Sequence, residues 1–402
     1  MFENIIGQIQ VVQRLSTEIR ERILPPALLF HGPDYSGKSS VALELARALT
    51  CTGSDPGVPW GCRCTSCTQQ RHLMQPETLL IGGRYFVREI SVAASALKRD
   101  DRPPHRFLFE RAVRKLSRRY DPVLWEGEEA RIRKVEPLLE QLDDALSPYL
   151  PDATAPSGDR FVKGIDGVLG VCEKLVGVQA LDAVPVAMVR RLSAWSRVAA
   201  SGRAKVAVIE NVDRLGESAR NALLKTLEEP SASVTFVLTT QRRGAVIATI
   251  QSRARAYGFL TRGPEESAQV IGRIFRDDTS DAASIRDYFM RVDGRALRPL
   301  AERFVEGCLG DVEIELGLLS ELDQTIVSLG RNEGFRYFAE ELSELFRLLL
   351  KRPGIEPRRL VEWRGLLMES AHRVEALNMQ PSRVLEALYY GMRRSIADQQ
   401  TA

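Results

Sequence analysis

No apolar run in this 402-residue chain reaches the roughly 20 residues needed to cross a lipid bilayer. The first residues, Met1 to Asn4, lack the basic segment followed by an apolar stretch that is typical of a secretory signal. A hydrophobic content of 44% with 27% charged residues is that of a soluble globular protein. We therefore expect a cytoplasmic protein with no membrane partner.

A strong net charge is also lacking, because 56 basic residues nearly balance 53 acidic ones, for a formal net charge of +3. Whole-chain electrostatics therefore do not indicate a nucleic-acid binder, and only local patches could. Cysteine is scarce, but four of the six cysteines fall between residues 51 and 67. In a cytosolic chain such clustering indicates metal binding rather than disulfides. The length predicts several domains, at about 100–200 residues each.

The strongest motif is Gly32-x-x-x-x-Gly37-Lys38-Ser39, which lies between an apolar strand predicted at 27–30 and a helix predicted at about 38–49. The glycines let backbone N–H groups turn toward phosphate oxygens at the positive end of the helix. We expect Lys38 to reach the β- and γ-phosphates, and Ser39, followed by Ser40, to lie at the Mg²⁺ ion. This pattern predicts ATP and Mg²⁺ as cofactors. The alternative is a degenerate loop that has kept its sequence and binds nothing.

An alternation of helices and strands resumes after a block of different character at about 84–181. It comprises a helix at 185–200, a strand at 206–209, a helix at 217–228 and a strand at 234–238. Such an alternation predicts a parallel sheet covered by helices. From about 263 onward no strand pattern of comparable strength occurs, and segments such as 335–350 and 383–395 are predicted helices. The fold class is therefore α/β plus α.

The strand at 206–209 is followed by Glu210-Asn211-Val212-Asp213. Glu210 stands where a P-loop enzyme places its metal-side carboxylate, and Asn211 stands where a water-activating carboxylate is expected. Asn cannot accept a proton, so the sequence supports nucleotide binding more strongly than hydrolysis. Asp213 is a badly phased substitute for the missing base, and both carboxylates have the alternative of being solvated charges at a strand end.

Five further segments carry a resemblance to a known family. They are Asn221–Pro230 (Asn-Ala-Leu-Leu-Lys-Thr-Leu-Glu-Glu-Pro), Ile5–Gln8, Leu24–Phe30, Thr249–Arg253, and Glu375–Pro381 followed by Leu385–Leu388. With the P-loop, they resemble the clamp-loader AAA+ ATPases of bacterial DNA replication, and within these the delta-prime subunits of DNA polymerase III. The resemblance covers about 1–81 and 185–402.

The resemblance implies three domains. An AAA+ nucleotide-binding domain would span 1–257, with a zinc-module candidate at 51–67 and an insertion at about 84–181. A helical lid would follow at 258–312, and a C-terminal helical collar for oligomerisation at 313–402. The implied partners are sister clamp-loader subunits of gamma/tau and delta type, the sliding clamp, and primed DNA through the complex.

The resemblance also implies roles for single residues. Arg253 matches the arginine that reaches the nucleotide of a neighbouring subunit, where it would stabilise charge on the transferred phosphoryl group. Thr239 matches the position that senses the γ-phosphate, and Arg298 is the nearest candidate for the arginine of the lid. Each has a plainer alternative, namely a surface arginine or a strand-end threonine.

The cysteines match the family's zinc module in content but not in spacing, which is Cys51-x10-Cys62-x1-Cys64-x2-Cys67. Four thiolates can enclose a tetrahedral Zn²⁺ at about 2.3 Å per bond, and Gly53, Gly57 and Gly61 would make the long arm flexible. Such a site has no open position and should do no chemistry. The alternative is a set of reduced thiols.

The block at 84–181 has no counterpart in the family. Its first part is rich in Lys and Arg, including Arg111, Arg114, Arg118 and Arg119. These side chains could contact DNA phosphates, although a solvated helix face is the commoner explanation. Tyr120 and Trp125 could stack on bases, although packing within the block is the commoner role.

Three functions remain in competition. The first is a delta-prime-like clamp-loader subunit that binds ATP, has little or no ATPase activity of its own, and supplies Arg253 in trans. The second is the gamma/tau-like motor ATPase of the same complex, with Asp213 or Glu228 activating water. The third is a repair or recombination factor that binds DNA through the basic block.

Overall fold

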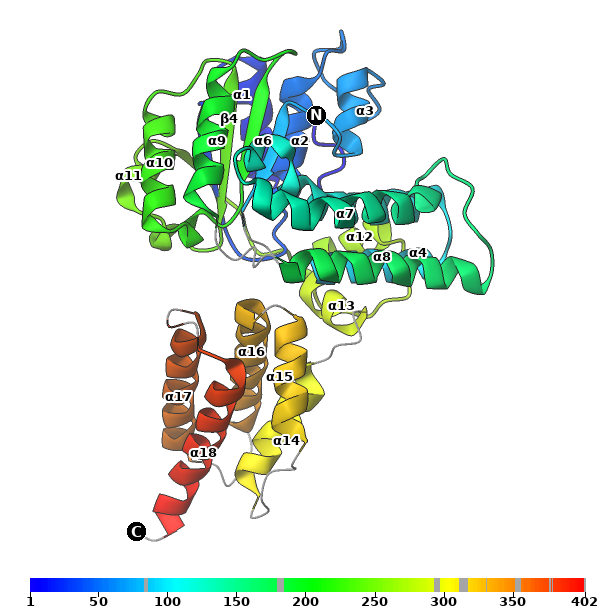
Figure 1. The fold of residues 1–402 in the computed structure, drawn as a ribbon. Helices are drawn as coiled ribbons and strands as arrows, with labels where there is room; N and C mark the ends of the chain where they lie inside the picture. Colours follow the sequence, from blue (N-terminus) through cyan, green and yellow to red (C-terminus); the bar gives the residue numbers. More distant parts are fainter. Residues whose placement is uncertain are drawn as a thin grey trace. The chain divides into compact units, whose positions relative to one another are not determined.

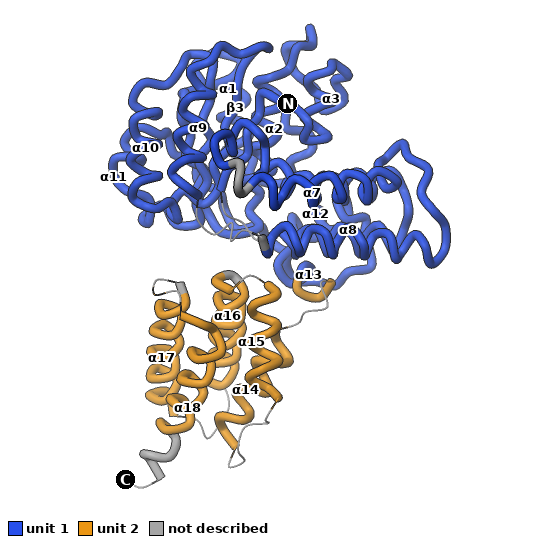
Figure 2. The backbone as a smooth tube through the Cα atoms, viewed as in Figure 1, with its two compact units in different colours: residues 1–289 blue, residues 290–402 orange. Residues whose placement is uncertain are grey.

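A computed structural model describes the chain except residues 83–85, 179–183, 293–296, 311–316, 330, 351–355, 376, 378, 401 and 402. The chain forms two compact units, residues 1–289 and 290–402 (Figure 2). Both ends of the predicted insertion, 84 and 181, lie outside the described residues, as does the predicted boundary at 312/313. The division into lid and collar therefore stays a prediction.

The first unit is built on a sheet that has five strands within the described residues, in the order β2-β3-β4-β1-β5, all parallel. The strands are β1 (Ala27–His31), β2 (Thr78–Ile81), β3 (Lys205–Ile209), β4 (Val234–Thr240) and β5 (Arg255–Gly258). Every residue of β2 and β3 is buried. Continuous burial is expected where helices cover both faces of a parallel sheet.

The sheet has a hydrophobic core on each face. Successive residues of β1 contribute to the two cores in turn, because successive side chains of a strand point to opposite faces. Leu28 and Phe30 of β1 join a core with α1 (Ile9–Arg20) and α2 (Lys38–Thr50). Ala27 and Leu29 join the core on the other face, with α9 (Val186–Arg197) and α10 (Glu217–Glu228) (Figure 1). The remaining helices of this part are α3 (Thr65–Arg71), α11 (Ala248–Gln251), α12 (Pro264–Ile274) and α13 (Ile285–Val292).

The block between β2 and α9 consists of helices and their connecting loops, with no strand among its described residues. It contains α4 (Val87–Arg99), α5 (Pro103–Ser117), α6 (Pro122–Trp125), α7 (Glu129–Leu146) and α8 (Asp159–Val178), with the short 3₁₀ turn η1 (Arg118–Tyr120). In Figure 1, α7 and α8 run side by side away from the sheet. Phe109, Leu116 and Ile165 are fully buried in the same core that contains Leu29 of β1. The block is therefore part of the sheet's own core.

The second unit consists of helices in its described residues: α14 (Leu297–Leu309), α15 (Leu318–Ser328), α16 (Arg331–Leu349), α17 (Pro357–Glu375) and α18 (Pro381–Gln400). Trp363 of α17 is completely buried, and its indole N–H donates to the hydroxyl of Ser395 (2.8 Å) and to the Met392 carbonyl (3.2 Å) of α18. Its ring also packs against Phe346 of α16. A large aromatic side chain of this kind fixes three helices together.

The predicted fold class is confirmed: a P-loop parallel sheet is followed by a helical region, with no strand among the described residues after β5. The helix predicted at 217–228 coincides with α10. The elements that were not predicted include β2, β5 and the helix α3 inside the cysteine segment. In β5 only Tyr257 is buried, so this edge strand has no apolar run to reveal it. Among the described helices, none is both long and apolar enough to cross a membrane.

Candidate functional site

The loop between β1 and α2 has a backbone that its glycines permit. Gly32 has φ +149° and Gly37 has φ +94°, in the region that favours glycine. A Cβ on Gly32 would lie 2.3 Å from the carbonyl oxygen of Phe259, which leaves no space for a side chain. Gly37 is the N-cap of α2, so the unpaired N–H groups of the first helical turn border the loop. The strand, loop and helix that an anion site needs are therefore present.

Lys38 lies inside this loop and is 9% exposed. Its amino group donates to the carbonyl oxygens of Gly32 and Pro33, at 2.6 Å each, and lies 3.4 Å from the Ser36 hydroxyl. The charge is therefore held at the centre of the loop, within reach of an anion that the loop would enclose. Ser40, the other predicted member of this segment, is exposed on α2.

Ser39 and Glu210 come together at the end of β3, although the chain separates them widely. The Ser39 hydroxyl donates to one carboxylate oxygen of Glu210, which is 4% exposed. The other carboxylate oxygen accepts a hydrogen bond from the guanidinium of Arg119, in η1 of the helical block. The sequence analysis placed both Ser39 and Glu210 at the expected metal ion, but it did not predict the arginine.

This arrangement bears on the predicted Mg²⁺ ion. The Ser39 hydroxyl keeps its lone pairs for a metal while it donates to Glu210. The Glu210 carboxylate, however, is already neutralised by Arg119, which is itself buried and positively charged. Divalent magnesium is usually held through carboxylate charge. The hydroxyl therefore fits the ion, whereas the paired carboxylate does not.

Asn211 lies beside the predicted γ-phosphate sensor. It adopts a left-handed backbone (φ +52°), and its N–H donates to the hydroxyl of Thr239 at 3.3 Å. Thr239 is 3% exposed at the end of β4. The proposed substitute base, Asp213, accepts a hydrogen bond from the Thr240 hydroxyl at 2.7 Å. Asp213 is thus engaged with β4 rather than directed at a nucleotide.

Arg262 is a loop residue that the sequence analysis missed. Its guanidinium donates to the carbonyl of Tyr35 in the P-loop and to that of Ile6 (3.2 Å). It also lies directly against Gly37, where a Cβ would be 2.5 Å from a guanidinium nitrogen. Burial lowers the pKa of Arg262 below its usual value. Gln8 holds the segment just before Arg262, because its side-chain amide pairs with both the N–H and the C=O of Leu260. Nothing in the local sequence around residue 262 signals this contact.

Arg253 lies at the surface after α11. One guanidinium nitrogen donates to Glu228 at 2.7 Å and another to the Thr249 carbonyl at 2.9 Å, and its side chain is 34% exposed. Because such exposed ion pairs contribute little, the arginine can exchange Glu228 for another anion at small cost. In the second unit, Arg298 pairs with Glu302 at 2.7 Å and with Glu341 at 3.3 Å.

The arginines of the helical block have a role that differs from both interpretations of the sequence. Arg111 donates to the carbonyl of Arg71, Arg114 to that of His72 (2.9 Å), and Arg118 to those of Gln75 (3.1 Å) and Thr78 (2.8 Å). These side chains attach the block to the segment before β2, so a solvated basic face is the wrong interpretation for them. Tyr120 and Trp125 stack on each other and are buried, as packing residues would be.

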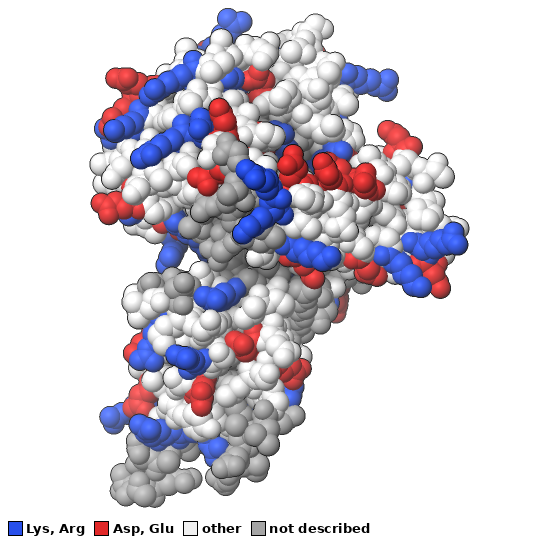
Figure 3. Space-filling model, in the orientation of Figure 1, with Lys and Arg blue, Asp and Glu red and all other residues white. Residues whose placement is uncertain are grey.

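The visible surface of the block is acidic along α7. Glu136, Glu140, Asp143 and Asp144 are exposed, and Figure 3 shows a row of acidic side chains there. Carboxylates along a helix repel phosphates. Neither these arginines, which are engaged with backbone carbonyls, nor this acidic face favours DNA binding through the block.

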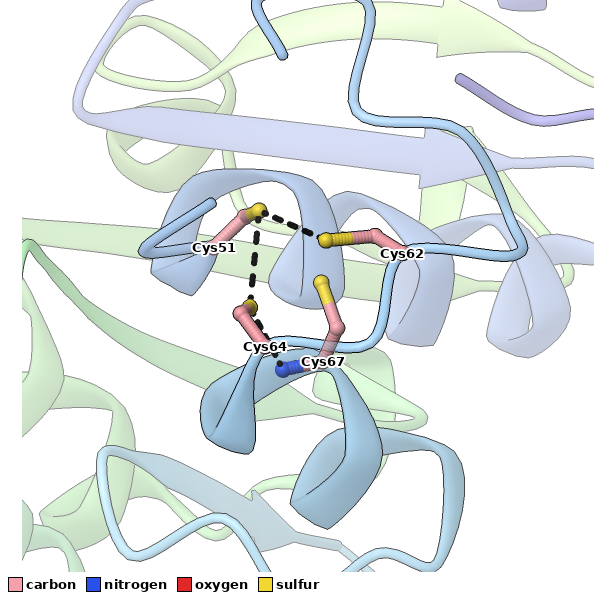
Figure 4. Close-up of side chains that lie close together, drawn as sticks. All are labelled: Cys51, Cys62, Cys64 and Cys67. Carbon is pink, nitrogen blue, oxygen red and sulfur yellow. Dashed lines mark hydrogen bonds between the residues drawn. The ribbon is translucent and has the colours of Figure 1, made fainter. Parts of the chain in front are cut away.

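The four clustered cysteines converge (Figure 4). Their sulfur atoms all lie within 4.8 Å of one another, and Cys51 is 3.8 Å from both Cys62 and Cys64. Four sulfurs placed tetrahedrally around Zn²⁺ at about 2.3 Å would be separated by about 3.8 Å. A Cβ on Gly53 would lie 2.8 Å from the sulfur of Cys62. The cluster therefore fits zinc, and glycine is required at position 53.

Helix ends explain how the atypical spacing works. Cys51 is the C-cap of α2, Cys64 is the N-cap of α3, and Cys67 lies in the first turn of α3. The long arm from Cys51 to Cys62 is not loose, because buried Arg47 donates to the carbonyls of Val58 (2.8 Å) and Pro59 (3.1 Å) and to the sulfur of Cys67 (3.2 Å). N–H groups that donate to cysteine sulfur favour the thiolate form.

The cysteine environments differ in their effect on protonation. Burial raises the pKa of Cys51 and of Cys67. Burial also acts to raise the pKa of Cys64, but hydrogen bonds from the Cys67 N–H and from Thr52 outweigh it and lower that pKa to about 5. A metal held by these sulfurs would keep all four as thiolates.

Comparison with known proteins places the chain. Residues 7–100 and 177–262 match the family model described as DNA polymerase III, delta subunit. The delta' subunit of DNA polymerase III from Escherichia coli is 34% identical over 114 residues, which is 28% of this chain and 28% of that protein. The tau subunit from Escherichia coli is 34% identical over 129 residues, 32% of this chain and 17% of that protein.

A plant protein, STICHEL-like 4 of Arabidopsis thaliana, is 42% identical over 66 residues, 16% of this chain and 7% of that protein. The chain thus spans between 7% and 28% of the length of these three relatives. The sheet order and the loop after β1 define a P-loop α/β protein. The matches over residues 7–100 and 177–262 support a member of the clamp-loader family of DNA polymerase III.

Proposed function

We propose that this chain is a delta-prime-like subunit of a bacterial clamp loader, which helps to place a sliding clamp on primed DNA in the cytoplasm. It would bind ATP at Gly32, Gly37, Lys38 and Ser39, with little or no hydrolysis of its own. Arg253 would complete the nucleotide site of a neighbouring gamma/tau-like or delta-like subunit. The C-terminal helices would form the collar that joins these subunits.

One observation carries the proposal. At the end of β3, where a P-loop ATPase needs a base beside its metal-side carboxylate, the chain has Asn211, and Glu210 is in a buried ion pair with Arg119. An amide cannot accept the proton of an attacking water. The loop is suited to hold a nucleotide, whereas the groups that would hydrolyse it are replaced or engaged.

Zinc would have a structural role in this protein. Cys51, Cys62, Cys64 and Cys67 would bind Zn²⁺ with four protein ligands, which leaves no position for a substrate. The metal would connect the C-terminal end of α2 with the N-terminal end of α3. We expect it to stabilise this corner of the P-loop unit rather than to take part in nucleotide chemistry.

ATP turnover tests the proposal. The purified chain should show no turnover above background, with or without primed DNA and clamp, and Lys38→Ala should leave that background unchanged. Robust turnover by the chain alone, abolished by Lys38→Ala, would instead identify the motor ATPase of the complex. The similarity to the tau subunit makes this the alternative to exclude.

A second measurement tests the assembly. A tagged chain expressed in its native cell should co-purify with sister clamp-loader subunits and the sliding clamp. Recovery without any of them would overturn the assignment to the complex, whatever the nucleotide assay gives.

A further inference from the structure

A buried contact reaches the P-loop site from the helical block. The guanidinium of Arg119 pairs with the Glu210 carboxylate, and the two side chains are 3% and 5% exposed. Residues 101–176 lie outside the segments that match the family model. Arg119 is therefore an addition to the site from a part of the chain that the family model does not cover.

The position of Arg119 is set by its surroundings. The indole N–H of Trp125 donates to the Arg119 carbonyl at 2.8 Å, and the Tyr120 hydroxyl donates to the Leu175 carbonyl of α8 at 3.0 Å. The guanidinium also lies over the ring of Phe86, 5.2 Å from its centre. Packing on both sides of η1 thus directs the charged end of Arg119 to the end of β3.

We propose that Arg119 makes this P-loop a metal-independent site for a nucleoside di- or triphosphate. The guanidinium supplies to Glu210 the positive charge that Mg²⁺ would otherwise supply, and its own charge opposes the entry of a divalent cation. Lys38 and the N–H groups at the start of α2 would bind the phosphates. The inference rests on nucleotide binding as proposed above and adds the form of nucleotide that the site takes.

The neighbouring arginine, Arg118, does not contact Glu210. Arg118 lies in the same turn, but its guanidinium donates to the backbone carbonyls of Gln75 and Thr78 and pairs with Asp121 at 2.9 Å. It is therefore a matched control for an arginine of η1 that fixes the block without touching Glu210.

The test compares the binding of a fluorescent ATP analogue to the full chain in excess EDTA and in excess Mg²⁺. The wild-type protein should bind with the same affinity in both. Arg119→Met should gain Mg²⁺ dependence, with affinity at least about tenfold higher in Mg²⁺ than in EDTA, a difference of about 1.4 kcal/mol. Arg118→Met should behave as wild type.

Mn²⁺ provides a second readout, because its electron paramagnetic resonance signal reports binding directly. Adding wild-type protein with ADP should leave the Mn²⁺ signal as ADP alone leaves it, whereas Arg119→Met should remove additional free Mn²⁺. A purely structural ion pair would not change this signal.

The outcomes separate the two proposals. Wild-type binding that requires Mg²⁺ would overturn the metal-independent site and leave the proposed function standing. No binding of nucleotide by the wild-type chain in either buffer would overturn both. Since the wild-type comparison decides by itself, the test holds even if Arg119→Met fails to fold.

Discussion

At the residue scale, the most informative side chains are those whose partners lie far away in the sequence. Glu210 and Asn211 could be predicted, because a carboxylate at the end of a buried strand after a P-loop has few other uses. Arg119 could not, because its partner lies 91 positions away and its own segment has the pattern of a basic helix face. Arg262 was missed for the same reason. Long-range polar contacts leave no local periodicity to detect.

Glu18 is another such residue, since it connects α1 to the edge strand β5. Its carboxylate accepts hydrogen bonds from the Tyr257 hydroxyl, from Arg14 (2.9 Å) and from Arg255 (3.1 Å). Burial alone would raise the pKa of Glu18, but these three partners together lower it below its usual value. A lowered carboxyl pKa contributes stability above the unfolded-state pKa, and that stability is lost as the pH falls through the folded-state pKa.

We therefore predict that Glu18→Gln lowers the urea midpoint at pH 7 and that the difference from wild type shrinks as the pH falls below about 4.3, the ordinary value for glutamate. Urea unfolding at a series of pH values measures this. Glu21→Gln, which changes an exposed residue of the same segment, should show no such trend. A difference between Glu18→Gln and wild type that stays constant down to acidic pH would contradict the prediction.

At the scale of elements, strong strands and helices could be predicted and weak ones could not. The strands β1, β3 and β4 are apolar runs beside clear helices, and each lies within two residues of its predicted bounds. The strand β5 and the helix α3 are fixed by tertiary contacts, an edge of the sheet in one case and a cysteine cluster in the other. The cysteine cluster itself could be predicted from composition, although its geometry depends on two helix ends.

The helical block gives a prediction about its attachment. Arg111 is half-buried and donates to the carbonyl of Arg71, so a carboxylate in its place would leave that carbonyl without its donor and repel it. We predict that Arg111→Glu destabilises the P-loop unit by about 1–3 kcal/mol. Arg160→Glu, on the exposed face of α8, should change stability by less than about 0.5 kcal/mol. Urea unfolding of both variants measures the two destabilisations. Equally small losses of stability would mean that the block is loosely attached.

The cysteine cluster gives a prediction about metal. The wild-type chain should contain one zinc per molecule by inductively coupled plasma mass spectrometry, and Cys62→Ser should lose it. Gly53→Ala, whose added Cβ would lie 2.8 Å from the Cys62 sulfur, should release zinc to a chelator faster than wild type. Cys172→Ala is the control, because that cysteine is buried in the other core. Zinc-free wild-type protein that unfolds at the same temperature as the loaded form would exclude a stabilising role.

At the scale of the whole molecule, the chain forms two compact units, residues 1–289 and 290–402, whereas the resemblance to clamp loaders implied three domains. The family model covers the sheet, most of its helices and α4, but neither residues 101–176 of the central helical block nor the second unit. The roles proposed for Arg253 and for the collar concern surfaces that act on other chains. Experiments on the isolated chain cannot test either role, so both must be tested in the assembled complex.

Arg253→Ala should lower ATP turnover by the assembled complex while leaving nucleotide binding by this chain unchanged. An arginine supplied in trans stabilises the transferred phosphoryl group and can contribute about 10³-fold or more to the rate. Arg242→Ala, which removes another exposed arginine of the P-loop unit, should leave turnover at the wild-type level. Equal turnover of the Arg253→Ala and wild-type complexes would remove the trans role.

The shared core of the sheet and the helical block has a consequence for folding kinetics. The chain leaves the sheet at Ile81 and returns at Lys205, yet these two strands are hydrogen-bonded neighbours. Closing so long a loop is slow, and until it closes β3 exposes an unpaired apolar edge on which other chains can add. The helices between the two strands shorten this delay if they collapse first. During synthesis, early collapse of the helical block would then bring β2 and β3 together and shorten the time for which β3 is unpaired.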